Sequence, residues 1–129
     1  MVNGTMTTSA VALALVFACG LSAASASSRV VRLAELEIDA AQLDSYKAAL
    51  TEEIETSIRV EPGVLSLSAV AVKGNPAQIR ILEVYADDAA CQSHLETPHF
   101  KKYKTLTQKM VKSLKRIETD PIVLGSKGK

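Results

Sequence analysis

Alternating and branched apolar residues predict four β-strands in this chain. The clearest alternation lies within residues 77–86, and residues 30–38 and 64–72 are rich in the branched side chains that favour strands. A short run of turn-forming residues, Lys73 to Pro76, separates the second of these segments from the third, so we expect an antiparallel hairpin. Residues 113–118 form a shorter fourth candidate strand.

Two other regions place apolar residues three or four positions apart, as amphipathic helices do. The first begins at Asp39, a capping residue, and ends at the turn Glu61-Pro62-Gly63. Its predicted buried face carries Leu43, Tyr46, Leu50, Ile54 and Ile58, and its predicted outer face carries Asp44, Lys47, Glu52, Glu53 and Glu55. The second region runs from Asp88 to about Val111. Thr97-Pro98 interrupts it and restarts it, with Pro at the first helical position.

The order strand, helix, strand, strand, helix, strand predicts an α+β fold of the ferredoxin-like split βαββαβ type, with an antiparallel sheet. Helices would cover one face of that sheet only. The other face, predicted to carry Val64, Val70 and Val72, would need cover, and a second copy of the sheet supplies it most simply. We therefore expect a homodimer with two sheets face to face, and an irregular tail from residue 120 onward.

The first 28 residues contain no acidic or basic side chain, unlike the rest of the chain. An apolar run at 10–18 precedes Ala24-Ser25-Ala26, the small-x-small pattern of a signal peptidase site. We predict a signal peptide over residues 1–26 and a periplasmic or secreted protein, with a cytoplasmic location as the alternative if the leader does not function. The apolar run is too short to span a bilayer, so no membrane span is expected.

The predicted mature domain covers residues 27–129, with its core at 30–118. Cys19 lies in a sequence that loosely resembles a lipobox, which leaves a lipid anchor as the less favoured processing route. Either cleavage leaves Cys91 without an intrachain partner, so no disulfide is expected to stabilise the fold. The formal net charge of +1 gives no basic footprint for nucleic acid.

Both histidines of the chain lie in the second helical region, His94 before the interruption at Thr97-Pro98 and His99 directly after it. His94 is the leading candidate for a general base. His99 is a second catalytic candidate; the structural alternatives are a half-buried His94 bonded to a carbonyl and an exposed His99. Glu83 and Tyr85 share a strand face and could bind a hydroxylated substrate. Equally, Glu83 could pair with a basic residue at a dimer seam and Tyr85 could belong to the core.

Cys91, His94 and His99 could suggest a metal, since Cys and His three positions apart share a helix face. Their spacing matches no zinc pattern and a further ligand would have to come from elsewhere, so no metal is predicted. No phosphate-binding loop, nucleophile elbow or metalloprotease motif occurs in the sequence.

Four motifs occur in an order that resembles the antibiotic biosynthesis monooxygenase family, in its small quinol-monooxygenase-like branch. They are A-E-L-E-I at 34–38, V-E-P-G at 60–63, E-V-Y-A-D-D-A-A at 83–90 and H-L-E-T-P-H-F-K-K-Y at 94–103. The resemblance covers roughly residues 30–118. It implies a dimeric ferredoxin-like α+β barrel, the architecture already predicted from the order of the elements.

The resemblance also implies that the protein oxidises a quinol or polyphenol-like aromatic with O2, without metal, flavin or haem. His94 would be the base or phenolate partner, with Glu83, Tyr85 and His99 as supporting groups. The expected partners are thus a small aromatic substrate, O2 and a second copy of the chain. No cofactor is expected. Two alternatives stay open, since a fold does not settle a reaction: an isomerase of a small carbonyl compound, and an exported binding or stress-response module without catalysis.

Overall fold

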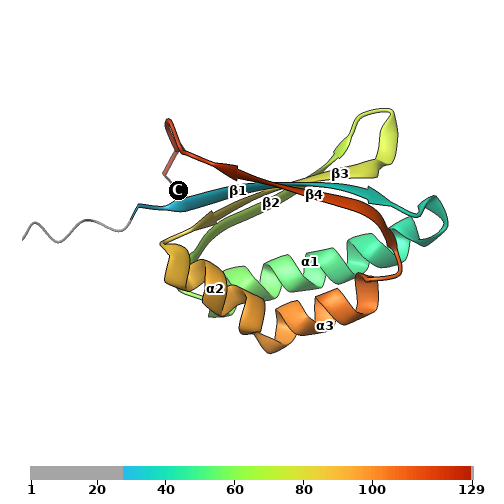
Figure 1. The fold of residues 1–129 in the computed structure, drawn as a ribbon, viewed down its shortest axis with the longest axis horizontal. Helices are drawn as coiled ribbons and strands as arrows, with labels where there is room; N and C mark the ends of the chain where they lie inside the picture. Colours follow the sequence, from blue (N-terminus) through green and yellow to red (C-terminus); the bar gives the residue numbers. More distant parts are fainter. Residues whose placement is uncertain (1–27, 129) are drawn as a thin grey trace, which may run out of the picture.

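The computed structural model describes residues 28–128, which form a four-stranded sheet with three α-helices (Figure 1). The predicted leader at 1–26 and the candidate lipid anchor at Cys19 lie outside the described residues. The strands and helices are β1 (Val30–Ile38), α1 (Leu43–Val60), β2 (Val64–Val72), β3 (Asn75–Tyr85), α2 (Asp88–Glu96), α3 (Pro98–Thr107) and β4 (Val111–Thr119), and a 3-10 turn, Ala40–Gln42, precedes α1.

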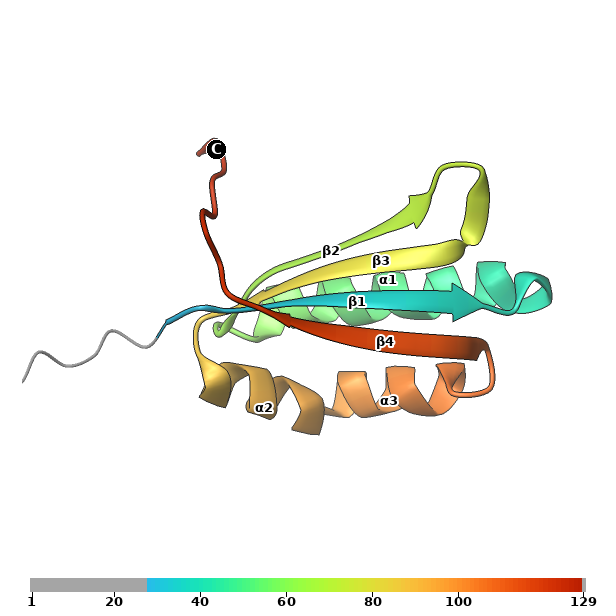
Figure 2. The ribbon, with the colours of Figure 1, turned by 45° about the horizontal axis from the view of Figure 1, so that its top comes forward.

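The strands are arranged in the order β2-β3-β1-β4, and every neighbouring pair is antiparallel. Figures 1 and 2 show α1, α2 and α3 on the same face of the sheet, with the other face uncovered. This confirms the predicted ferredoxin-like α+β arrangement. Residues 120–128 contain no helix or strand, as predicted, and extend away from the helices (Figure 2). Between residues 28 and 128, no helix has the length and apolar character needed to cross a membrane.

Two predicted boundaries in the second half were wrong. The hairpin turn is tighter than expected, because β3 already begins at Asn75 and Gly74 takes a positive φ of 81°. The last helix ends at Thr107 rather than near Val111. Val111 instead pairs with Ile38 across a β-bulge, so β4 is longer than the predicted segment 113–118.

The buried face of α1 also differs from the prediction. Four residues of α1 are buried, in a stripe at spacings of four, three and four: Tyr46, Leu50, Glu53 and Ser57. Glu53 was placed on the outer face but is only 5% exposed, whereas Ile58 was placed inside but is 48% exposed. The buried stripe was predicted from apolar residues alone. The prediction was displaced because two residues of the observed stripe, Glu53 and Ser57, are polar.

Two apolar clusters hold the helices on the sheet. The larger joins β1 and β3 to α1, through Ala34, Leu36, Ile38, Ile79, Ile81, Tyr46 and Leu50. The smaller contains Val64, Tyr85 and Cys91. Val64 was predicted on the uncovered face. A register shift between Val64 and Ser66 allows it to pack with Tyr85 under the helices instead.

The uncovered face of the sheet exposes apolar side chains. Val70 and Leu82 are 62% and 42% exposed. Leu82 shares a face of β3 with Arg80, and Val70 pairs with Arg80, so Val70 and Leu82 both lie on the side of the sheet opposite Ile79 and Ile81.

Candidate active site

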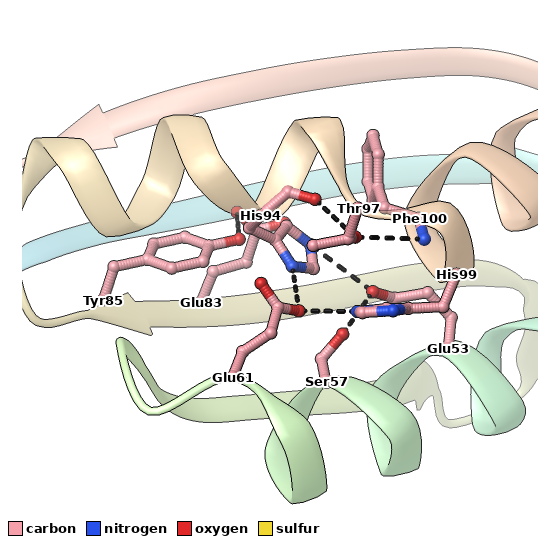
Figure 3. Close-up of polar contacts among 9 residues, drawn as sticks. All are labelled: Glu53, Ser57, Glu61, Glu83, Tyr85, His94, Thr97, His99 and Phe100. Carbon is pink, nitrogen blue, oxygen red and sulfur yellow. Dashed lines mark hydrogen bonds and ion pairs between the residues drawn. The ribbon is translucent and has the colours of Figure 1, made fainter.

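His94 lies in the last turn of α2 and is buried, with only 3% of its side chain exposed. Its two ring nitrogens face two different carboxylates, as Figure 3 shows. Nδ1 is 2.9 Å from Oε2 of Glu61, and Nε2 is 3.4 Å from Oε1 of Glu53. The first contact is a hydrogen bond, whereas the second is within ion-pair distance but is not a hydrogen bond. The ring is therefore anchored at Nδ1 and more loosely held at Nε2.

Glu61 binds both histidines through one oxygen. Its Oε2 lies 2.9 Å from His94 Nδ1 and 2.6 Å from His99 Nε2. Burial by itself raises the pKa of Glu61, but the hydrogen bonds with His94 and His99 outweigh burial and hold that pKa below its ordinary value. Glu61 is thus an ionised carboxylate at the junction of the three helices, and it fixes the orientation of both rings.

The break between α2 and α3 brings the two histidines to the same carboxylate. Thr97 ends α2 by donating from its hydroxyl to the His94 carbonyl at 2.7 Å, and the same hydroxyl accepts from the Phe100 backbone N–H at 3.3 Å. Pro98 occupies the first position of α3, where a backbone N–H would have no partner within the helix, so its lack of an N–H costs no hydrogen bond. His99 therefore begins a new helix and its ring turns back toward Glu61. The predicted cap at Thr97-Pro98 is confirmed.

Glu53 is the second carboxylate at His94 and projects inward from the middle of α1. Ser57, one turn later, donates a hydrogen bond of 2.8 Å to its Oε1. Burial raises the pKa of Glu53 above its ordinary value, although Ser57 and the two imidazoles act in the opposite direction. Glu53 is consequently able to hold a proton closer to neutral pH than an exposed glutamate does.

Glu83 and Tyr85 share the helix-covered face of β3, as predicted. The Tyr85 hydroxyl donates to Glu83 Oε2 at 3.2 Å, and the Tyr85 ring centre lies 5.5 Å from that of His94. Tyr85 is 1% exposed and belongs to the smaller apolar cluster. Burial raises the pKa of Glu83, and the hydrogen bond from Tyr85 only partly offsets it. The pKa of Tyr85 is itself raised by burial, so its phenol stays protonated.

A cavity of about 210 Å³ lies between the helix-covered face of the sheet and helices α1 and α3. Its polar lining includes Glu53, Glu83 and His94. Apolar lining comes from Leu36, Leu50, Ile54, Leu67, Ile81, Phe100, Tyr103, Val111 and Leu114, among others. Tyr85 is not among the lining residues, and His99 instead borders a smaller hollow beside Glu53 and Tyr103. The structure thus brings His94 and Glu83 to one cavity, with Tyr85 and His99 behind them.

Sequence reasoning missed Glu53 and Glu61, the two carboxylates that contact His94. One signal was available: Glu53, Ser57 and Glu61 are spaced four residues apart, which puts three polar side chains in one line along a helix. The structure also separates Cys91 from the two histidines with which it was considered as a metal ligand. The Cys91 side chain contacts Arg32 instead, whose Nη1 lies 2.6 Å from the Cys91 Sγ.

Glu61 takes the place of Cys91 beside the two histidines. One donor atom each from Glu61, His94 and His99 lies within 4.8 Å of the other two. These three residues are therefore the group, among the described residues, that could hold a metal ion.

Comparison with known proteins agrees with this architecture. The family model of the antibiotic biosynthesis monooxygenases matches residues 29–106, more than half of the chain. A crystal structure from Bacteroides thetaiotaomicron, named as a candidate antibiotic biosynthesis monooxygenase, is 52% identical, with a TM-score of 0.75, over 79% of this chain and 97% of that one. No match is found among functionally curated proteins.

Two further structures extend the likeness. A candidate monooxygenase from Lactobacillus acidophilus is 35% identical, with a TM-score of 0.67, over 68% of this chain but only 42% of its own length. A candidate antibiotic biosynthesis monooxygenase from Nitrosomonas europaea is 19% identical, with a TM-score of 0.69, over 73% of this chain and 90% of that one, and shows the common fold alone. Taken with the family model and the Bacteroides structure, these findings show that the chain belongs to the antibiotic biosynthesis monooxygenase family.

Proposed function

We propose that this protein is a cofactor-independent monooxygenase that oxidises a quinol or polyphenol-like small aromatic with O2. The observation that carries the proposal is the setting of His94. Its Nδ1 is anchored by Glu61 at 2.9 Å, and its Nε2 lies on the side of Glu53, which lines the same cavity as His94. A neutral ring that donates from Nδ1 keeps an unprotonated Nε2, and that atom can accept a proton from a bound phenol.

The first step of the proposed reaction is loss of the phenol proton to His94. The carboxylates of Glu61 and Glu53 then flank the protonated ring and stabilise its positive charge. The resulting phenolate is electron-rich enough to reduce O2 directly. One oxygen atom enters the ring, the other leaves as water, and the substrate supplies all the electrons. The protein needs to orient the ring, exclude water and hold the proton.

The cavity suits a small aromatic guest. At about 210 Å³ it is smaller than the roughly 300–1,000 Å³ that encloses drug-sized ligands, so one or two rings would fill it. Phe100, whose ring centre lies 4.9 Å from that of His94, and Tyr103 give it aromatic walls. Glu83, with a raised pKa, can donate a hydrogen bond to a substrate oxygen when it is protonated.

Oxygen uptake tests this proposal. Purified protein is mixed with a panel of hydroquinones in the presence of a chelator, beside an autoxidation blank without protein. We expect uptake well above the blank, and its loss in His94→Ala. Gln92→Ala, on the exposed side of the same helix, is the matched control and should keep full activity. Uptake equal to the blank across the panel would overturn the proposal, and turnover of a carbonyl compound without O2 would point to the isomerase.

We also propose that two copies pair through the uncovered sheet face. Exposed Val70 and Leu82 and the Arg80–Glu35 ion pair at 3.6 Å give that face an apolar centre with charges beside it. Light scattering should report a dimer for the native chain and a monomer for Leu82→Glu. A matched change on the exposed side of α1, Ile58→Glu, should leave the dimer intact. A monomeric native protein would contradict this pairing.

We further propose that the protein acts outside the cytoplasm after removal of residues 1–26. The support is the uncharged, small-residue leader described above. Mass spectrometry of the protein recovered from the cell envelope should give an amino terminus at Ser27. A chain that keeps Met1 and stays in the cytoplasm would contradict the proposal, and a lipid-modified Cys19 would assign the other processing route.

A further inference from the structure

We propose that Glu61, His94 and His99 form a binding site for a divalent transition-metal ion of the zinc class. The ion would sit at the junction of the three helices, behind the cavity, and would be held by Glu61 Oε2, His94 Nδ1 and His99 Nε2. Two imidazoles and one carboxylate are a donor set that favours zinc, iron(II), cobalt(II) or nickel(II) over calcium or magnesium.

The donor atoms already converge on one point. Glu61 Oε2 is 2.9 Å from His94 Nδ1 and 2.6 Å from His99 Nε2, and all three atoms lie within 4.8 Å of one another. In a tetrahedral zinc site with bonds of about 2.1 Å, the donor atoms lie roughly 3.4 Å apart. The two short contacts would therefore lengthen by less than an ångström around an ion, and the two imidazole nitrogens, which lie within 4.8 Å of each other, would close by up to about 1.4 Å. That movement is within reach of side-chain rotation at Glu61 and His99.

The surroundings of His94 also fit a metal ligand. A histidine that binds metal through one ring nitrogen commonly donates the proton on its other nitrogen to a carboxylate. His94 Nε2 faces Glu53 Oε1 at 3.4 Å, and Ser57 in turn fixes that oxygen with a hydrogen bond of 2.8 Å. Glu53 thus stands where an outer carboxylate is needed. The ligands and this outer group come from α1 and its end, from α2 and from the first turn of α3.

The site would keep an open position on the ion, and two of its three ligands are partly exposed. Three protein ligands leave room for a water molecule on the ion, as in zinc sites that exchange ligands. The side chains of Glu61 and His99 are 12% and 16% exposed, whereas that of His94 is 3% exposed. An ion would therefore enter from the side of Glu61 and His99 and complete its coordination at His94.

Occupancy would inhibit the proposed reaction, and this consequence rests on the proposed function. An ion bound to Nδ1 of a neutral His94 leaves the ring proton on Nε2. That nitrogen then has no lone pair to accept the proton of a phenol. The same residues would thus act as a base assembly without metal and as a metal site with it. Binding of the ion, in contrast, does not depend on the reaction.

Metal titration without substrate tests the site directly. The full chain is stripped with a chelator and titrated with Co²⁺, then with Zn²⁺ in competition with a chromophoric chelator. We expect one ion per chain and visible cobalt bands without the sulfur charge-transfer band that a thiolate would add. His99→Gln and Glu61→Gln should lose the site, while Glu53→Gln should weaken Zn²⁺ binding by about 10–100-fold, the usual effect of an outer-shell partner.

Two controls exclude metal binding by a cysteine and loss of binding through unfolding. A variant with both cysteines replaced by serine should bind Zn²⁺ as tightly as the native chain, and circular dichroism should show that each ligand variant is folded. No binding by the native chain, or equal binding by folded His99→Gln, would overturn the inference. The titration contains no substrate, so its result does not depend on the reaction. A protein that binds Zn²⁺ here but consumes no O2 in the separate hydroquinone assay would contradict the proposed function and leave the metal site standing.

Discussion

Glu61 and Glu83 approach His94 from different elements, the end of α1 and strand β3 (Figure 3), and their surroundings shift their acidities in opposite directions. Glu61 lies at the helix junction, where hydrogen bonds with two imidazoles outweigh burial and lower its pKa. Glu83 lies on the sheet, where burial outweighs one hydrogen bond from Tyr85 and raises its pKa. The same side chain is thus a fixed negative charge in one region and a proton-holding group in the other.

This difference assigns separate roles to the two regions. The helix junction orients His94 through a charge, which requires an ionised partner close to its Nδ1. The sheet region offers a carboxyl group that can donate a hydrogen bond into the cavity. Pairs of titratable groups with acidities pushed apart are typical of sites that move protons. Single substitutions can therefore test the two regions separately.

Replacing His94 should have the largest effect, because it links the two regions. We expect His94→Gln to lower kcat for a quinol by about 10²–10⁴-fold, the usual contribution of a positioned general base. Steady-state oxygen uptake measures the loss, and Gln92→Ala supplies the control. A folded His94→Gln protein with native kcat would show that His94 is not the general base of the reaction.

Glu61→Gln tests the charge at the helix junction in metal-free protein. Two charge-assisted hydrogen bonds are lost, so we expect the free energy of unfolding to fall by about 2 kcal/mol near neutral pH. The folded pKa of Glu61 lies below its ordinary value of 4.5. Its contribution is therefore complete above that value and is lost as the pH falls through the lowered pKa.

Urea unfolding of the native chain and of Glu61→Gln across that acid range measures the effect. The difference between the two proteins should shrink steadily as the pH falls below the ordinary glutamate value. Glu96→Gln, an exposed glutamate paired with Lys101 on the surface, is the matched control and should cost far less. A constant difference at every pH would show that charge at Glu61 is not what stabilises the junction.

Tyr85→Phe tests the single hydrogen bond that restrains Glu83. Removal of the hydroxyl leaves the carboxyl without its neighbour at 3.2 Å, and we expect a loss of about 1 kcal/mol, seen as a drop in Tm of roughly 4–8 °C. Because Tyr85 does not line the cavity, KM should change little. A large rise in KM with an unchanged Tm would instead place the Tyr85 hydroxyl on the substrate.

Glu83→Gln should have the smallest effect on stability, and its sign should be opposite to that of Glu61→Gln. The raised pKa means that ionisation of Glu83 costs the folded state more than the unfolded state. The native chain therefore loses stability as the pH rises through the folded pKa, and Gln removes that loss. In thermal melts, the Tm of Glu83→Gln relative to that of the native chain should rise between acid and mildly alkaline pH. A fall in this relative Tm over the same range would contradict the raised pKa of Glu83.

Patterning predicted the fold because each element carried its own signal. The alternation in β3, the cap at Asp39 and the break at Thr97-Pro98 are local features, and the structure confirms each of them. The displacement of Val64 was not predictable in this way. A β-bulge depends on how two strands fit together, and one strand alone does not reveal it.

The site was predicted only in part for the same physical reason. His94 and Glu83 were named because imidazole and a strand-face carboxylate are recognisable in sequence. Glu53 and Glu61 were assigned to a solvent face and to a turn, since a buried carboxylate becomes recognisable only once its partners are placed. Cys91 and His94 are three apart on one helix, yet Cys91 contacts Arg32 of β1, and no rule of helical spacing supplies that partner.

Isotopically labelled dioxygen tests whether the protein is a monooxygenase that uses His94 as its base. The metal-free protein is incubated with a hydroquinone under labelled O2, and the product is analysed by mass spectrometry. We expect one labelled oxygen atom in each product molecule, formed by the native chain and by Gln92→Ala but not by His94→Gln. A product without label, or label incorporated equally by His94→Gln, would contradict a monooxygenase that uses His94 as its base.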